Sequence, residues 1–293
     1  MDMPFHIGQL SKYSIRGLVF AALLLVAACA SVPPVQVGEF RTGANAVKVQ
    51  LDTTFAAVNK LASEDAIDRA ATLQNLTEDE LEPVLKREDI ARWNAAFAAI
   101  DEYAANLNLL LSPEHATNFG AATEGLGTAL NSLDLNISPG IATGFAELGR
   151  LLITAKAESD AIGAARIADP GMQQIFSAMA EAIGESNDRG IRGTVWAHWT
   201  DIRMANKKLE FLEAGETARR STVVAFVELR DQRDAQDLQL GSLRQSLLNL
   251  ATAHHALAEG SNIDLATAIS RIQQELAATR ALHEHFTSLQ PNP

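Results

Sequence analysis

The spacing of apolar side chains constrains this fold most, because they recur every three or four residues over long stretches. From Arg87 to Leu111, alternating steps of three and four connect Ile90, Trp93, Phe97, Ile100, Ala104, Leu107 and Leu111. This spacing places one apolar stripe on one face of an α-helix, as in a coiled coil. The segment is therefore predicted to be a helix that packs on other helices.

Three further segments repeat this spacing. They contain Ile141, Phe145, Leu148, Leu152 and Ala155; Leu240, Leu243, Leu247, Leu250, His254 and Leu257; and Leu265, Ile269, Ile272, Leu276, Thr279, His283 and Phe286. The 293 residues are 47% hydrophobic but only 5% aromatic, and β-branched runs are scarce, a balance that favours helices over strands. We predict an all-α fold, an elongated helical bundle with long coiled-coil-like helices.

Capping residues and helix breakers divide the chain into about seven predicted helices. Ser112-Pro113, Ser138-Pro139 and Asp169-Pro170 each place a capping side chain before a proline, which is typical of a helix start. Gly260-Ser261-Asn262 predicts a tight turn between two antiparallel helices. The predicted helices cover 45–74, 78–111, 113–133, 139–168, 170–187, 191–258 with a bend near Gly215, and 263–289. Residues 45–290 form one bundle domain or two sub-bundles that meet near 169–171.

The N-terminal region has the pattern of a secretion signal. Lys12 and Arg16 precede an uncharged run of 12 residues, Gly17–Ala28. As a helix this run would rise about 18 Å, short of the roughly 30 Å hydrocarbon core of a bilayer. Residues 1–28 are therefore predicted to be a cleavable signal peptide.

Val26-Ala27-Ala28-Cys29 follows at the end of that run. It resembles the lipobox of bacterial lipoproteins, in which an aliphatic residue and two small residues precede a cysteine. The resemblance implies that the Cys29 thiol takes a diacylglyceryl group, that a peptidase cuts before Cys29, and that the new amine receives a fatty acid such as palmitate. Two or three acyl chains hold a protein on a membrane persistently. The alternative is an ordinary signal peptide with a chance cysteine near its cleavage site.

The residue after the cysteine and the segment that follows bear on where the protein is held. Ala30, rather than an aspartate, implies by the same resemblance an outer-membrane lipoprotein that faces the periplasm, rather than one of the inner membrane. Residues 29–44 contain two prolines and two glycines and are predicted to be a lipidated, extended linker. The expected location is the bacterial cell envelope.

A basic aromatic segment stands out in a chain whose formal charge is −12. It contains Arg189, Arg192, Trp196, Trp199, Arg203, Lys207 and Lys208. Such a segment can bind anionic headgroups or a polyanion such as peptidoglycan. Two indoles three residues apart on a helix more often belong to a bundle core with a charged outer face. Nucleic acid is not expected as a partner, because an acidic surface repels phosphates.

The histidines invite a metal site but lack the required spacing. His254 adjoins His255, and His283 lies two residues from His285. Two ligands on one helical face need a spacing of three or four. The sequence therefore predicts neither a metal site nor a cofactor.

No local motif of a hydrolase, a nucleotide-binding protein or a calcium-binding protein occurs in the chain. We therefore expect a non-enzymatic, lipid-anchored envelope protein with a structural or protein-interaction role. A membrane-active protein that remodels or perforates lipid is the alternative, since residues 116–155 hold only four charged side chains. Their longest uncharged stretch is 12 residues, too short to span a bilayer. A hydrolase of envelope polymers is a third possibility.

Overall fold

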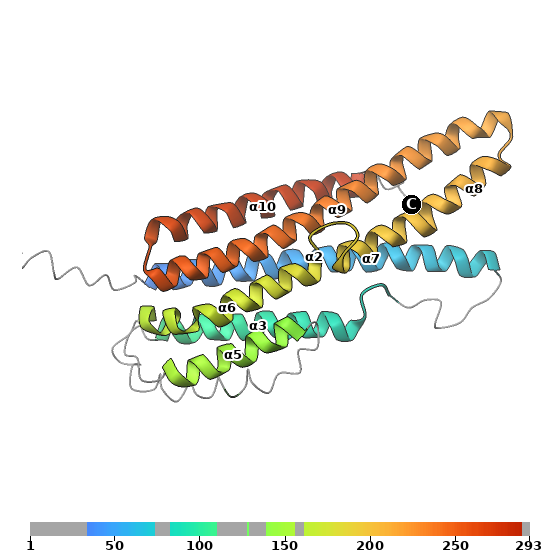
Figure 1. The fold of residues 1–293 in the computed structure, drawn as a ribbon. Helices are drawn as coiled ribbons and strands as arrows, with labels where there is room; N and C mark the ends of the chain where they lie inside the picture. Colours follow the sequence, from blue (N-terminus) through green and yellow to red (C-terminus); the bar gives the residue numbers. More distant parts are fainter. Residues whose placement is uncertain (1–33, 74–82, 110–127, 129–138, 156–160, 289–293) are drawn as a thin grey trace, which may run out of the picture. The chain divides into compact units, whose positions relative to one another are not determined.

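The computed structural model describes residues 34–73, 83–109, 128, 139–155 and 161–288. Within these ranges the regular structure is helical and includes no strand. The elements are α2 (Pro34–Leu73), α3 (Arg87–Leu109), α5 (Pro139–Ala155), α6 (Ala161–Ile183), α7 (Gly190–His198), the π-helix η2 (Trp199–Met204), α8 (Ala205–Glu213), α9 (Glu216–Glu259) and α10 (Asn262–Ser288) (Figure 1). Because α7, η2 and α8 follow one another without a break, the described residues include seven continuous helical rods. The predicted all-α bundle is confirmed.

The long helix α9 organises the packing of the other helices. It contacts α10, α6 and α2, while α5 packs on α6 and α3 packs on α2. Edge-to-face aromatic pairs join the layers, with ring centroids 6.4 Å apart for Phe40 and Phe176 and 5.7 Å apart for Phe55 and Trp93. The bundle therefore has one continuous apolar core.

Most of the described members of the four apolar stripes expected from the sequence lie in this core, and Ile90 is half-buried at its edge. Fully buried members include Phe97, Ile100 and Leu107 of α3, and Phe145 and Leu148 of α5. In α9 the whole row is buried, namely Leu240, Leu243, Leu247, Leu250, His254 and Leu257. The turn between α9 and α10 is also as predicted, because Gly260 ends α9 in the left-handed conformation at φ 69°.

The linker prediction is wrong for residues 34–44, which form the first turns of α2. Val37, Phe40 and Ala44 are buried, and the same three–four spacing continues to Val47 and Leu51. Gly43 is a packing residue, because a Cβ there would lie 3.1 Å from the Ile269 side chain of α10. Glycine and proline suggested a flexible segment, but here they start a helix and allow close packing.

The predicted helix start at Pro170 is also wrong, because α6 runs from Ala161 through Pro170 to Ile183. Asp169 does not cap a helix; it binds histidine side chains of α9. A Cβ on Gly171 would lie 2.9 Å from the Leu148 backbone, so α5 and α6 approach closely here. No sub-bundle boundary therefore falls at residues 169–171.

The long helix predicted over 191–258 is a hairpin instead of a bent rod. The rod α7–η2–α8 ends at Glu213, and α9 begins at Glu216 after the chain reverses at Ala214-Gly215. Figure 1 shows α8 and the start of α9 side by side.

Two other helix boundaries differ from the predicted ones. Helix α3 begins at Arg87, not at 78, and helix α6 ends at Ile183, before 187. The signal peptide, the lipobox and most of the predicted helix 113–133 lie outside the described residues.

Candidate functional site

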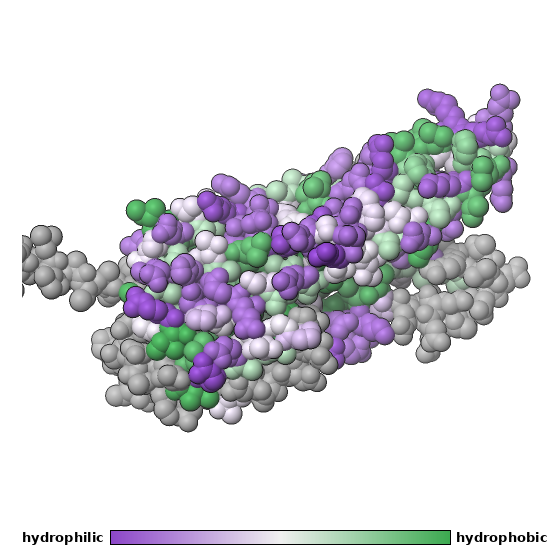
Figure 2. Space-filling model, in the orientation of Figure 1, coloured by the Kyte–Doolittle hydropathy of each residue, from purple (hydrophilic) through white to green (hydrophobic). Residues whose placement is uncertain are grey.

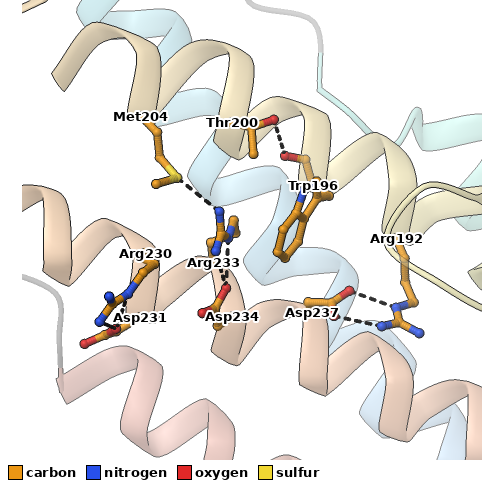
Figure 3. A network of polar contacts seen from close by, with 9 residues as sticks. All are labelled: Arg192, Trp196, Thr200, Met204, Arg230, Asp231, Arg233, Asp234 and Asp237. Atoms are coloured by element: carbon orange, nitrogen blue, oxygen red, sulfur yellow. Dashed lines mark hydrogen bonds and ion pairs between the residues drawn. The ribbon is translucent and has the colours of Figure 1, made fainter. Parts of the chain in front are cut away.

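The basic aromatic segment lies along the rod α7–η2–α8, facing α9 on one side and α2 on another. Its first anchored cation, Arg192, forms a two-pronged ion pair with Asp237 of α9, with N–O distances of 2.9 and 2.8 Å (Figure 3). Arg192 Nη1 also donates to the Glu185 carbonyl at 2.8 Å. The side chains of Arg192 and Asp237 are only 14% and 19% exposed. This cation is therefore used to hold two helices together.

The two indoles face α9. Trp199 is fully buried, and its Nε1 donates to Gln236 Oε1 at 2.6 Å. Trp196 is half-buried, with the Arg233 guanidinium carbon 4.0 Å from its ring centroid (Figure 3). Arg233 also donates to Asp234 and to Met204 Sδ. Trp199 is thus a core residue, which is the bundle-core alternative that the sequence left open, and it is not available to a binding surface.

Arg203 connects the same rod to α2. It pairs with Asp65 and, at 3.6 Å, with Glu64, and its guanidinium carbon lies 5.1 Å from the Trp199 ring centroid. Asp65 also contacts His198 Nε2 at 2.7 Å. We call the contacts of Arg192, Trp196, Trp199, Arg203 and Arg233 the clamp. The clamp spans the π-helical turn, a local widening that often marks a functional position in a helix.

Beyond the clamp, the hairpin formed by α8 and the start of α9 exposes apolar side chains. Leu212 is 72% exposed, Leu209 58% and Val223 49%. Between the two helices lies an open groove of about 350 Å³, lined by Lys207, Lys208, Phe211, Leu212, Thr222, Val223 and Phe226. Figure 2 shows hydrophobic side chains gathered on this hairpin, between hydrophilic ones. Large exposed apolar patches of this kind mark interaction sites.

The described part of the neighbouring helix α10 ends at Ser288, short of the groove. Ser242 Oγ of α9 lies 3.2 Å from the Glu275 carbonyl of α10. The two helices are antiparallel, so Ser288, 13 residues after Glu275, reaches the level of about residue 229 of α9. Among the described residues, the first turns of α9 therefore have α8 as a neighbour but no part of α10.

The two lysines at the groove differ in their contacts. Lys207 Nζ pairs with Glu210 at 2.5 Å on the same helix. Lys208 Nζ lies 5.9 Å from the Phe226 ring centroid, across the groove. Of the predicted basic segment, the arginines of the clamp are enclosed, whereas these lysines line an apolar surface.

A second polar cluster, which the sequence analysis missed, joins α3, α6 and α9. His254 Nδ1 contacts Asp169 at 2.8 Å, and His254 Nε2 contacts Tyr103 Oη at 2.7 Å. His255 Nδ1 contacts the other Asp169 oxygen at 2.7 Å, and Gln173 donates to the same carboxylate. A neutral His254 satisfies both of its contacts: its Nδ1 donates a hydrogen bond to Asp169, and its Nε2 accepts one from the Tyr103 hydroxyl.

The electrostatics of this cluster follow from burial and hydrogen bonding. Burial raises the pKa of Asp169, but the bonds from His254, His255 and Gln173 outweigh it and lower the pKa to about 2. Burial lowers the pKa of His254, whereas the bond to Asp169 raises the pKa of the exposed His255. His254 and Tyr103 are at most 1% exposed, so this part of the cluster lies inside the bundle and ties helices together.

The described residues also bear on two other features, a membrane-spanning helix and a metal site. None of their helices is long and apolar enough to cross a membrane. In the same part of the chain, no group of three or more His, Cys, Asp or Glu side chains could hold a metal ion.

Comparisons with protein-family models, with curated proteins and with solved structures find no match to this chain. Among the described residues, the hairpin groove is the strongest candidate site.

Proposed function

We propose that this chain is a lipid-anchored helical-bundle protein of the bacterial cell envelope, with a structural or protein-interaction role. In this proposal Cys29 carries the lipid, the protein is held at the outer membrane facing the periplasm, and the α8–α9 hairpin binds an envelope protein. The single observation that carries the interaction role is the open apolar groove of the hairpin, in a bundle whose other helices are closely packed.

The placement of the groove supports this role. If Cys29 is the anchor, four residues separate it from Pro34, and a chain that short reaches at most about 18 Å. The start of α2 lies beside the far end of α9, because the Phe40 and His254 rings are 5.5 Å apart. From His254 to Glu216 the helix α9 rises about 57 Å. The groove would thus be presented well away from the anchored end.

The anchor is tested on the native protein. Mass spectrometry should find a diacylglyceryl group on Cys29 and no residues 1–28, and Cys29→Ser should move the protein from the membrane fraction to the soluble fraction. An unmodified thiol on a processed chain would contradict the proposal.

The interaction is tested by photo-crosslinking in cells. A photoreactive residue at Leu212 should give a discrete crosslinked protein. The same residue at Ile263, which is 81% exposed in the α9–α10 turn region, should not. Equal crosslinking at both positions, or none at Leu212, would count against the hairpin as the binding surface.

The competing function is disturbance of lipid by the hairpin, which the exposed apolar side chains beside lysines would favour. Release of a trapped dye from anionic vesicles, abolished by Leu212→Asp, would support that function instead of a protein-binding role.

A further inference from the structure

The α8–α9 groove has the geometry of a site that lacks one helix. Along most of its length α9 packs against several helices, but near Val223 and Phe226 it has α8 beside it and lies beyond the described part of α10. Two helices cover only part of each other's apolar faces, whereas a third helix laid along the pair completes a three-helix bundle. The open shape of the groove therefore fits a helical occupant.

The charges around the groove restrict which helix fits. The seven lining residues include two lysines and no carboxylate, in a chain whose formal charge is −12. Lys208 lies over the Phe226 ring, so its ammonium stands at the edge of the apolar surface. An occupant with carboxylates beside its apolar stripe would place them next to the lysine ammonium groups at this edge.

From these two observations we propose that the groove binds one acidic amphipathic helix of a partner protein. Its apolar side chains fill the space between Phe211, Leu212 and Val223. Its flanking carboxylates pair with Lys208 and compete with Glu210 for Lys207. This inference rests on the proposed interaction role and names the chemistry of the partner.

Other occupants fit the groove less well. Sites for small amphiphiles bury about 70–90% of the ligand surface, whereas here the lining residue Leu212 is itself 72% exposed. A second copy docked groove to groove would bring its own lysine pair against Lys207 and Lys208.

Two synthetic peptides test the inference on the full-length protein. Both are 18-residue amphipathic helices with the same leucine stripe, flanked by glutamates in one and by lysines in the other. The glutamate peptide should shift the methyl NMR signals of Leu212 and Val223 and bind at least tenfold more tightly than the lysine peptide. The double substitution Lys207→Glu/Lys208→Glu should reverse this preference.

Matched variants separate the groove from the general surface. Leu212→Asp should abolish binding of the glutamate peptide, whereas Leu238→Asp, at a site on α9 that is 57% exposed and does not line the groove, should not. Lys60→Glu, on the exposed face of α2, should leave the charge preference unchanged. Circular dichroism checks that each variant is folded.

Several results would overturn the inference. Equal binding of the two peptides, or methyl shifts away from the hairpin, would exclude an acidic helix in the groove. Binding to phosphatidylglycerol vesicles that Leu212→Asp abolishes would assign the surface to lipid, and dimerisation abolished by the same variant would assign it to a second copy. If Leu212 crosslinks an envelope protein in cells but the glutamate peptide does not bind, the interaction role stands and this partner chemistry is rejected.

Discussion

The clamp and the groove lie on the same two helical rods, yet the cations of the two regions have different partners. In the clamp, Arg192 and Arg203 meet carboxylates on neighbouring helices, and Arg233 covers an indole. In the groove, Lys208 lies over the Phe226 ring, and Lys207 pairs with Glu210 of its own helix. The difference arises because α2 and α9 supply partners beside η2, whereas the described part of α10 ends before the hairpin. Whether a basic residue on a helix joins neighbouring helices or stays accessible to a binding partner therefore depends on which other helices pack beside it.

The largest expected effect is in the clamp, at Trp199. Replacing the fully buried indole by alanine removes its packing and its bond to Gln236. Trp199→Ala should lower the free energy of unfolding by about 3–5 kcal/mol, in the range of large core deletions. Urea unfolding followed by circular dichroism measures this value. A loss below about 1 kcal/mol would mean that the clamp is as loosely packed as the groove.

The Arg192–Asp237 pair should show a smaller but specific effect. Both side chains are mostly buried and joined by two hydrogen bonds, so either single alanine substitution leaves a charge without its partner. Each should cost about 1–3 kcal/mol, between the values for exposed and fully buried pairs. A double-mutant cycle should give a coupling of about 1–2 kcal/mol, and additive losses would contradict a structural ion pair.

The cluster around Asp169 should contribute to stability in a pH-dependent way. His255 has a raised pKa in the folded protein, so its stabilising contribution is present below its ordinary pKa of 6.5 and is lost as the pH rises through the raised value. The stability difference between the native protein and His255→Asn should therefore be larger at pH 5.5 than at pH 8.5. It should stay below about 1 kcal/mol, because exposed pairs are screened by solvent. A larger difference at pH 8.5 would show that the assigned contact is wrong.

His254 should act with the opposite sign. Burial lowers its pKa, so its contribution is present above pH 6.5 and is lost as the pH falls toward the lowered value. Unfolding of the His255→Asn variant, in which this histidine titrates without its neighbour, should therefore become easier on acidification from pH 7 to pH 5.

Much of the bundle could be predicted from the sequence, because a three–four apolar spacing depends only on the geometry of one helix. Phe97, Leu148, Leu247 and Ile272 are buried as their spacing indicated. The turn at Gly260 was equally local, since it requires a residue that adopts a positive φ. The expected lipid anchor at Cys29 stays a prediction.

The features that were missed depend on contacts between distant segments. Gly43 and Pro170 suggest breaks when each is considered alone, and only the neighbours Ile269 and Leu148 show that these stretches are close-packed helices. Asp169 has the sequence context of a helix cap, but His254 lies 85 residues further along the chain. The spacing of Trp196 and Trp199 allowed either a core or a surface, and it is the position of α9 that buries Trp199.

The smallest effect on stability is expected for a substitution in the groove. Such a substitution tests most directly whether the groove, unlike the clamp, contributes little to folding. Leu212 is 72% exposed, so Leu212→Ala removes few contacts and should change the free energy of unfolding by no more than about 0.5 kcal/mol. The same substitution should weaken crosslinking to the envelope partner, because a smaller side chain buries less apolar area when a partner covers it. Urea unfolding and cell crosslinking are measured on the same variant, with Leu238→Ala as the exposed control. A loss of stability comparable to that of Trp199→Ala would show that Leu212 belongs to the folding core, and the division of these two rods into a closed half and an open half would fail.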